Sequence, residues 1–286
     1  MRKILNIVIM VLVAVCAYGQ GQRDADAKVK EAAGLIRKGD VSTAKTILLD
    51  AQKIYEKLGE TVIPEYATNL HLLGKCFLQS DASVAARYAG AAVDLRRKLI
   101  GTASVDYIES CHVLATAYHD MGKSDEAVVL HRQVVETAGK LKLDEKAVAP
   151  YLIGYGNDLA SEEDYVNALK VMEEALKGVV KFSPIYDGLL DKMIAIAGVS
   201  GNTRRLNRYK SLKMESDIEN GRIEPPMVVV EQPKEEKKVV KEEEKQEAEP
   251  KVVEEQEPQK KEKKKNSRKQ KRDKKAKQPQ PRVMDF

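Results

Sequence analysis

Small residues recur at intervals of 41 or 42 along much of this 286-residue chain. One column of alanines consists of Ala44, Ala86, Ala127 and Ala168. A second small-residue column lies twelve residues earlier, at Ala32, Gly74, Ala115 and Gly156. Larger apolar residues follow those at Leu35, Phe77, Tyr118 and Leu159. A fourth column holds Ala51, Val93, Val134 and Ala175. Columns in phase across four copies predict an internal repeat whose paired elements approach closely at the small residues.

Residues 104–140 indicate what one copy folds into. Their first half has an apolar stripe at helical spacing, at Leu114, Ala115 and Tyr118. Their second half has another, at Ala127, Leu130 and Val134. Gly122 between the stripes is a helix stop, and Ser124, followed by two acidic residues, is predicted to cap the next helix. Each copy is therefore a pair of helices, which needs neighbouring pairs to bury its apolar face.

These residues, with their partners in the other copies, resemble the tetratricopeptide repeat (TPR) family over roughly residues 24–215. The period of 41–42 residues is closer to the longer kinesin-light-chain-like variant than to the usual repeat of about 34 residues. The chain departs from the pattern in having no tryptophan, a glycine at position 90 where a bulky residue is usual, and no proline closing each repeat. The resemblance implies an all-α, right-handed solenoid of helical hairpins whose groove binds a protein or peptide.

The predicted repeat domain, residues 24–215, divides into four hairpins and a terminal pair. The hairpins are expected within residues 24–60, 63–100, 104–140 and about 144–181. Residues 184–215 are predicted to form a degenerate fifth unit or a capping pair. Its last helix is basic through Arg204, Arg205, Arg208 and Lys210. A charged, soluble last helix suits the end of a repeat array, where no further neighbour covers it.

Residues 1–19 are typical of a secretory signal peptide. A positively charged start precedes an apolar run, Ile4 to Val15, which is too short to span a bilayer. Small residues up to Gly19 predict cleavage after that position. We therefore expect an exported protein of a bacterial periplasm or cell envelope. Three alternatives stay open: lipidation at Cys16, an uncleaved signal that anchors the protein in the membrane, and secretion.

Two cysteines lie beyond the predicted cleavage site, Cys76 and Cys111. Their positions in the repeat differ by about six residues, which separates them by about 9 Å along parallel helices. That separation is too large for a disulfide without distortion. Both are predicted to be buried free thiols.

Residues 222–286 are predicted to be a disordered tail with two blocks of opposite charge. Residues 222–259 carry seven Lys or Arg and twelve Glu, a net charge of −5. Residues 260–286 carry thirteen Lys or Arg and three acidic residues, a net charge of +10. The tail has a single aromatic residue, Phe286, and is dominated by Lys, Glu, Gln and Pro, so it cannot bury enough surface to fold.

The basic block has three interpretations. It is a solvated tail that aids solubility or pairs with the acidic block, an anchor to anionic lipid or envelope polymer, or a nucleic-acid contact. Nucleic acid is the least favoured, because no aromatic residues are interleaved for base stacking. The candidate polyanion contacts are Lys260, Lys261, Lys263, Lys264, Lys265, Arg268, Lys269, Lys271, Arg272, Lys274, Lys275 and Lys277.

The sequence contains no phosphate-binding loop, no HExxH or GxSxG motif and no cysteine pair spaced for a metal. Of the four histidines, His71 and His112 are 41 residues apart and occupy equivalent first-helix positions. First helices line the groove in this family. The candidate partner-binding residues are His71, Lys75, His112, Thr116, His119 and Asn157. Ordinary polar filling of a solvated face is the alternative, and a metal site would need carboxylates that the sequence does not place there.

These observations predict a non-catalytic scaffold with no cofactor. Its groove is expected to bind another protein or a peptide, while the tail tethers or tunes the assembly. The alternative function is a polyanion-binding protein that acts through the lysine-rich tail, with the repeats as a spacer. An enzyme on a helical scaffold is the least favoured class, because no catalytic motif supports it.

Overall fold

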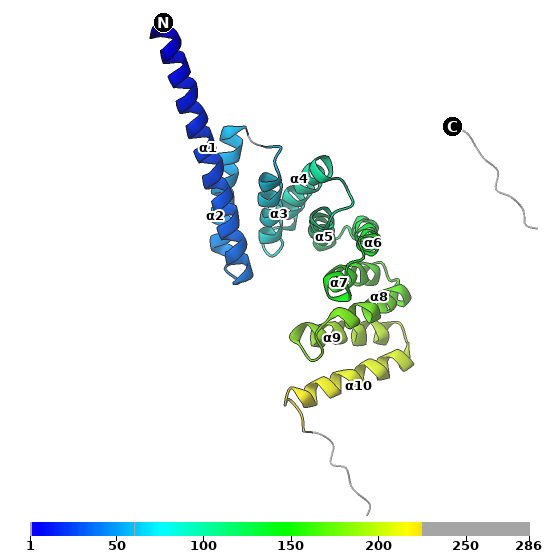
Figure 1. Cartoon of the computed structure of the whole chain (residues 1–286). Coiled ribbons are helices and arrows are strands. Elements are labelled where there is room, and N and C mark those ends of the chain that lie inside the picture. The colour runs from blue at the N-terminus through cyan, green and yellow to red at the C-terminus, as the bar shows by residue number, and fades with distance from the viewer. Residues whose placement is uncertain (1, 60, 225–286) are drawn as a thin grey trace, which may run out of the picture. The chain divides into compact units, whose positions relative to one another are not determined.

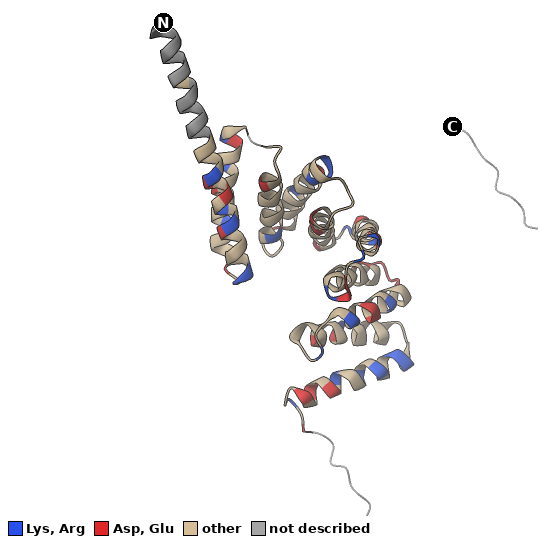
Figure 2. Ribbon diagram, in the orientation of Figure 1, with Lys and Arg blue, Asp and Glu red and all other residues tan. Residues whose placement is uncertain are grey.

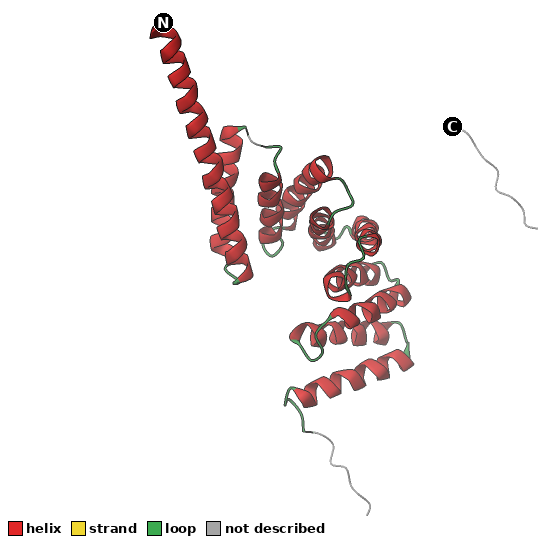
Figure 3. Ribbon diagram, viewed as in Figure 1, coloured by secondary structure: helices red, strands yellow, loops and turns green. Residues whose placement is uncertain are grey.

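The computed structural model describes residues 2–59 and 61–224, and within them all regular structure is helical (Figure 1, Figure 3). The helices described are α1 (Arg2–Arg37), α2 (Val41–Leu58), α3 (Pro64–Phe77), α4 (Ala82–Ile100), α5 (Val105–Asp120), α6 (Ser124–Lys140), α7 (Glu145–Ser161), α8 (Tyr165–Gly178), α9 (Pro184–Val199) and α10 (Thr203–Glu219). Each helix packs against the next, and the first helices of successive pairs, α1, α3, α5 and α7, also contact one another. This arrangement confirms the predicted all-α, TPR-like solenoid.

The helix starts follow from side chains that cap them. Asp40 Oδ1 accepts a hydrogen bond of 3.1 Å from the Thr43 amide at the start of α2, and Asp144 Oδ1 accepts one of 2.8 Å from the Ala147 amide at the start of α7. Such caps satisfy amides that have no partner inside the helix. The prediction for α6 was wrong in one detail. Ser124 is the first helical residue, and Lys123 occupies the cap position without a side-chain hydrogen bond.

Helix α4 corrects the alignment of the repeats by one residue. Ala44, Ala127 and Ala168 are completely buried, but in α4 the buried alanine is Ala85, whereas Ala86 is only half-buried. The physical reason lies in the preceding turn. The other four hairpin turns each contain a residue with positive φ, such as Gly39 and Gly122, and the turn from α3 to α4 has none. Phe77 precedes the buried Ala85 by eight residues, whereas Tyr118 precedes the buried Ala127 by nine, so α4 meets its partner one residue earlier.

Helix α1 is longer than predicted. The first hairpin is expected within residues 24–60, but its first helix runs without a break from Arg2 to Arg37. The sequence has no proline across this junction, so every residue there keeps the backbone N–H that a continuous helix needs. The predicted signal segment and the first repeat helix are therefore continuous in the backbone. Among the described residues, no helix combines the length and apolar character needed to cross a bilayer.

Buried side chains fill the space between the helices along the whole array. Large apolar residues from successive pairs are fully buried, among them Leu48, Leu73, Ile108 and Leu190. Cys76 and Cys111 are among the buried residues and neither forms a disulfide, as predicted. The last helix, α10, carries its basic residues toward its start and acidic residues toward its end (Figure 2).

Candidate functional site

A pocket of about 550 Å³ lies among α5, α7 and the segment from the end of α8 to the start of α9. We call it the α5–α9 pocket. Its walls are mainly apolar, with a few polar groups placed between the apolar side chains. The lining residues that matter below are His112, Thr116, Pro150, Asn157, Val180 and Ile185. A concave, mostly apolar wall with few polar groups is the usual composition of a ligand site.

A second pocket of about 470 Å³ adjoins the first, among α3, α5 and α7. We call it the α3–α7 pocket, and the two together the paired pockets. His71, Lys75 and Glu109 line it on the α3 and α5 side. Residues shared by both pockets are His112, Thr116, Lys146 and Pro150. Because α3, α5 and α7 are first helices of successive pairs, the paired pockets follow that face of the array.

Five of the six predicted partner-binding residues line the paired pockets. They are His71, Lys75, His112, Thr116 and Asn157. The sixth, His119, lines neither pocket and contacts a buried carboxylate instead. The five also differ in exposure: Lys75 is exposed, whereas His71 is only 5% exposed. The site therefore offers one cation and one largely covered imidazole at its α3 end.

His71 is held in place by a buried polar chain. Arg96 Nη1 donates to Ser110 Oγ at 2.8 Å, and that hydroxyl lies 3.3 Å from His71 Nδ1. The Ser110 hydroxyl, which accepts from Arg96, can also donate to Nδ1, and in that arrangement the His71 proton is on Nε2, 3.9 Å from Glu109 Oε2. Burial, with the nearby Arg96 and Lys75 charges, lowers the pKa of His71 to about 3. His71 is therefore neutral at physiological pH.

His112 belongs to a different buried network that crosses three helices. Its Nδ1 lies 2.8 Å from Nε2 of His131 on α6. His131 Nδ1 in turn lies 2.5 Å from Oδ2 of Asp158 on α7. The other oxygen, Asp158 Oδ1, lies 2.9 Å from His119 Nδ1, an ion-pair distance without hydrogen-bond geometry. The His112 ring also packs edge to face against the Tyr151 ring, with ring centroids 5.2 Å apart. We call these four polar residues the His–Asp network.

The charges in this network are arranged around Asp158, which is 1% exposed. Burial raises the pKa of the Asp158 carboxyl, but its contacts with His119 and His131 outweigh burial and hold the pKa below its usual value. The same carboxylate raises the pKa of His119. Burial, with His131 and Lys75 nearby, lowers the pKa of His112 to about 3. The proton that would balance the negative charge of Asp158 is thus favoured on His119 and disfavoured on His112.

Sequence reasoning missed His131 and Asp158. His131 lies four residues after Ala127 and three before Val134, on the buried stripe of α6, and this position was the available signal that it is a core histidine. Asp158 had no comparable signal. Asp120, the carboxylate next to His119 in the sequence, is exposed.

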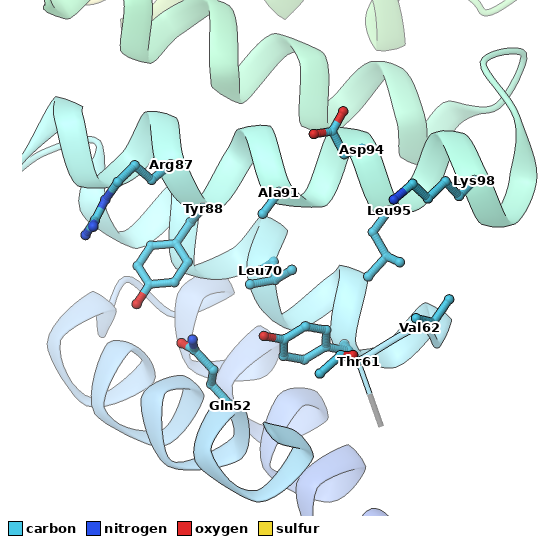
Figure 4. Close-up of a pocket in the computed structure, with 11 residues that line it drawn as sticks. Gln52, Thr61, Val62, Leu70, Arg87, Tyr88, Ala91, Asp94, Leu95 and Lys98 are labelled. Atoms are coloured by element: carbon cyan, nitrogen blue, oxygen red, sulfur yellow. The ribbon is translucent and has the colours of Figure 1, made fainter. Parts of the chain in front are cut away.

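Another pocket, of about 590 Å³, lies elsewhere on the molecule (Figure 4). It is formed by α2, α4, the start of α3 and the connection before α3, and its labelled side chains include Gln52, Tyr88 and Asp94. None of the predicted partner-binding residues lines it. Tyr66, which also lines it, donates a hydrogen bond of 3.2 Å from its hydroxyl to Glu56 Oε1.

The remaining predictions about sites concern metals and the tail. Within residues 2–59 and 61–224 there is no group of three or more His, Cys, Asp or Glu side chains arranged to hold a metal ion. The twelve predicted polyanion contacts, Lys260 to Lys277, lie outside the described residues. The basic block therefore stays a prediction from sequence.

Comparison with solved structures identifies the same fold in TPR-like proteins. A Podosopora anserina protein of nearly identical kinesin-light-chain TPR-like repeats has a TM-score of 0.59 and 17% identity, over 71% of this chain and 98% of its own. BtubC (BKLC) from P. vanneervenii has a TM-score of 0.54 and 14% identity, over 73% and 94%. The Rap conjugation gene regulator of plasmid pLS20, in complex with the Phr* peptide, has a TM-score of 0.50 and 16% identity, over 68% and 53%. No family model and no curated protein matched the chain.

Proposed function

We propose that the repeat domain is a non-catalytic binding module that takes a peptide segment of a partner protein in the paired pockets. The observation that carries this proposal is the position of the two adjoining pockets, which follow the first helices α3, α5 and α7 and share His112 and Thr116. An elongated double pocket suits an extended or helical peptide that places successive side chains in it. The similar fold of the Rap regulator, solved with the Phr* peptide, supports this proposal.

Exposed apolar side chains at the rim strengthen the case. Ile185 is 64% exposed and Val180 is similarly exposed, and both line the α5–α9 pocket. Large exposed apolar groups at the edge of a hollow are typical of an interaction surface. A bound peptide would cover them and remove their apolar area from water.

The experiment is selection of peptides from a random library on the full chain, followed by affinity measurement on two variants. Ile185→Glu places a charge at the pocket rim, and we expect it to weaken the selected peptides about tenfold or more. Val166→Glu is the matched control, because Val166 is 69% exposed on α8 and lines neither of the paired pockets. Peptides that bind equally to both variants, or the absence of any binding peptide, would refute the proposal.

Export and the basic tail complete the proposed function. We propose that the signal segment sends the protein to the cell envelope and that the tail tethers the bound assembly there. Sequencing the N-terminus of the mature protein tests cleavage after Gly19, and a full-length or lipidated product contradicts it.

The second candidate function is polyanion binding by the tail, and it is favoured by the net charge of +10 over residues 260–286. Binding to anionic vesicles should then weaken steeply with salt and vanish on deletion of that block. Binding that survives both changes would rule this function out.

A further inference from the structure

The His–Asp network determines which protons the paired pockets present to a ligand. Asp158 is ionised and buried, and an ionised carboxylate only accepts hydrogen bonds. The 2.5 Å contact with Asp158 therefore places a proton on His131 Nδ1. Because the same carboxylate raises the pKa of His119, which then carries the charge that balances Asp158, we assign His131 Nε2 as an acceptor. This is the carboxylate–imidazole arrangement that holds a histidine in one tautomer.

The protonation of His131 determines that of His112 through the contact between their rings. Since His131 Nε2 accepts, the 2.8 Å bond requires His112 Nδ1 to donate its proton. A neutral His112 then has no proton on Nε2. That nitrogen makes no hydrogen bond with any residue in the described part of the chain, and His112 is half-buried in the wall shared by the paired pockets. The pockets thus present a bare nitrogen acceptor at their junction.

We propose that Asp158, acting through His131, holds His112 as a hydrogen-bond acceptor at the junction of the paired pockets, and that the pockets take an acidic peptide which donates a backbone N–H there and inserts an aliphatic side chain beside it. This inference rests on the proposed function and names its ligand. Asp158 and His131 are positioning residues, and His112 is the contact.

The residues that line the pockets indicate which side chains the peptide carries. Val180, Ile185 and Pro150 form an apolar wall in the α5–α9 pocket, next to His112, that suits an aliphatic side chain. At the rim, Lys75 and Lys146 are exposed and form no ion pair with the described residues. Glu109 is the carboxylate that lines the α3–α7 pocket beside them. Two cations against one anion favour a peptide with acidic residues flanking the aliphatic one.

The tautomer is tested directly by ¹⁵N nuclear magnetic resonance of the full chain labelled at histidine. The chain has four histidines, so single substitutions assign every imidazole signal. We expect His112 to carry its proton on Nδ1, with Nε2 unprotonated, and His71 to show the opposite pattern. His119→Gln, which removes the other contact of Asp158, should leave His112 unchanged, whereas Asp158→Ala should abolish its fixed tautomer. A wild-type spectrum with a proton on Nε2 of His112 overturns the inference, whether or not Asp158→Ala folds.

The ligand is tested with three defined probes. The first is the acetylated pentapeptide amide Glu-Glu-Leu-Glu-Glu, the second replaces each Glu by Lys, and the third is N-methylated at Leu. We expect the first to shift the His112 Nε2 signal and each of the others to bind about tenfold more weakly. In His112→Leu the effect of N-methylation should disappear, because the acceptor is gone.

The outcomes separate the two proposals. Suppose that the selected peptides no longer bind Ile185→Glu but are basic, or that N-methylation does not weaken them. The proposed function then stands, and the assignment of an acidic peptide ligand is refuted. If no peptide, defined or selected, binds the paired pockets, the proposed function itself fails. In that case the ¹⁵N spectrum still decides the role of Asp158 and His131.

Discussion

His71 on α3 and His112 on α5 occupy equivalent positions in successive repeats, yet their Nδ1 atoms have partners of opposite character. His71 Nδ1 faces the Ser110 hydroxyl at 3.3 Å and is assigned as an acceptor, while His112 Nδ1 faces His131 Nε2 at 2.8 Å and is assigned as a donor. Both imidazoles are buried enough that the pKa of each falls to about 3. A shared position in the repeat therefore does not determine what the side chain does.

This burial predicts an acid-sensitive fold. As the pH falls below about 6.5, each of these histidines takes up a proton in the unfolded chain, whereas the folded protein resists until about pH 3. The unfolded state then binds more protons, so stability is complete above pH 6.5 and is lost progressively as the pH falls toward 3. Each histidine contributes a slope of about 1.4 kcal/mol per pH unit in this window.

The variant His71→Gln isolates one of the two slopes. Urea unfolding at a series of pH values should show that the free energy of unfolding of this variant falls less steeply below pH 6.5 than that of the wild type, by about 1.4 kcal/mol per pH unit. Parallel curves for the two proteins would show that His71 is protonated in the folded state.

Gly154 on α7 is predicted to be required for the His–Asp network. A Cβ at this position would lie 2.6 Å from His131 Nε2, a side chain that Asp158 and burial hold in place. We expect Gly154→Ala to lower the free energy of unfolding by about 1–3 kcal/mol, because the histidines must shift. Thermal unfolding measures the loss.

Gly90 provides the matched control on α4. A Cβ there meets no atom within 4 Å, so Gly90→Ala should stabilise the protein by about 0.5–1 kcal/mol through helix propensity alone. Equal effects of the two alanines would contradict the crowding at His131.

Arg96 and Arg97 are neighbours in sequence with opposite roles. Arg96 is 5% exposed and donates to the Asp106 carbonyl and to Ser110 Oγ. Arg96→Met leaves these buried groups without a donor and should cost about 2–3 kcal/mol. The Arg97 side chain is 56% exposed and pairs with Asp94 on the surface. Chemical denaturation of Arg97→Met should show almost no change, since exposed ion pairs contribute little.

Gly122 and Glu163 occupy the same turn position in successive repeats. Both have positive φ, 74° for Gly122 and 60° for Glu163, where a side chain is strained. Glu163→Gly should therefore stabilise the protein by about 0.5–1 kcal/mol, and Gly122→Ala should destabilise it by a similar amount. Midpoints of thermal unfolding compare the two. A destabilising Glu163→Gly would mean that the side chain contributes more than its backbone strain costs.

Much of the fold was predictable because its signals are local. Helix stripes, the aspartates that cap α2 and α7, and the glycines at Gly39 and Gly122 all act within a few residues of the chain. The period then placed His71 and His112 at equivalent sites, and the structure brings both to the wall of the α3–α7 pocket.

The alignment of α4 was decided by tertiary structure. Positions 85 and 86 are both alanine, so composition alone does not distinguish which of them is buried. The choice depends on the connection before α4, which lacks a residue with positive φ and places the buried alanine eight residues after Phe77, where the equivalent spacing from Tyr118 to Ala127 is nine. A difference of one residue rotates a helix by about 100°, which changes the buried face.

The sequence by itself determined that this chain is an array of helical hairpins, because small and apolar residues repeat at the spacing that pairs helices. Only the tertiary structure decided the chemistry between them. His112, His131 and Asp158 lie on three helices at positions unrelated by the repeat, so no periodic pattern connects them. Their contacts arise from how α5, α6 and α7 pack, and burial among these helices lowers the pKa of His112.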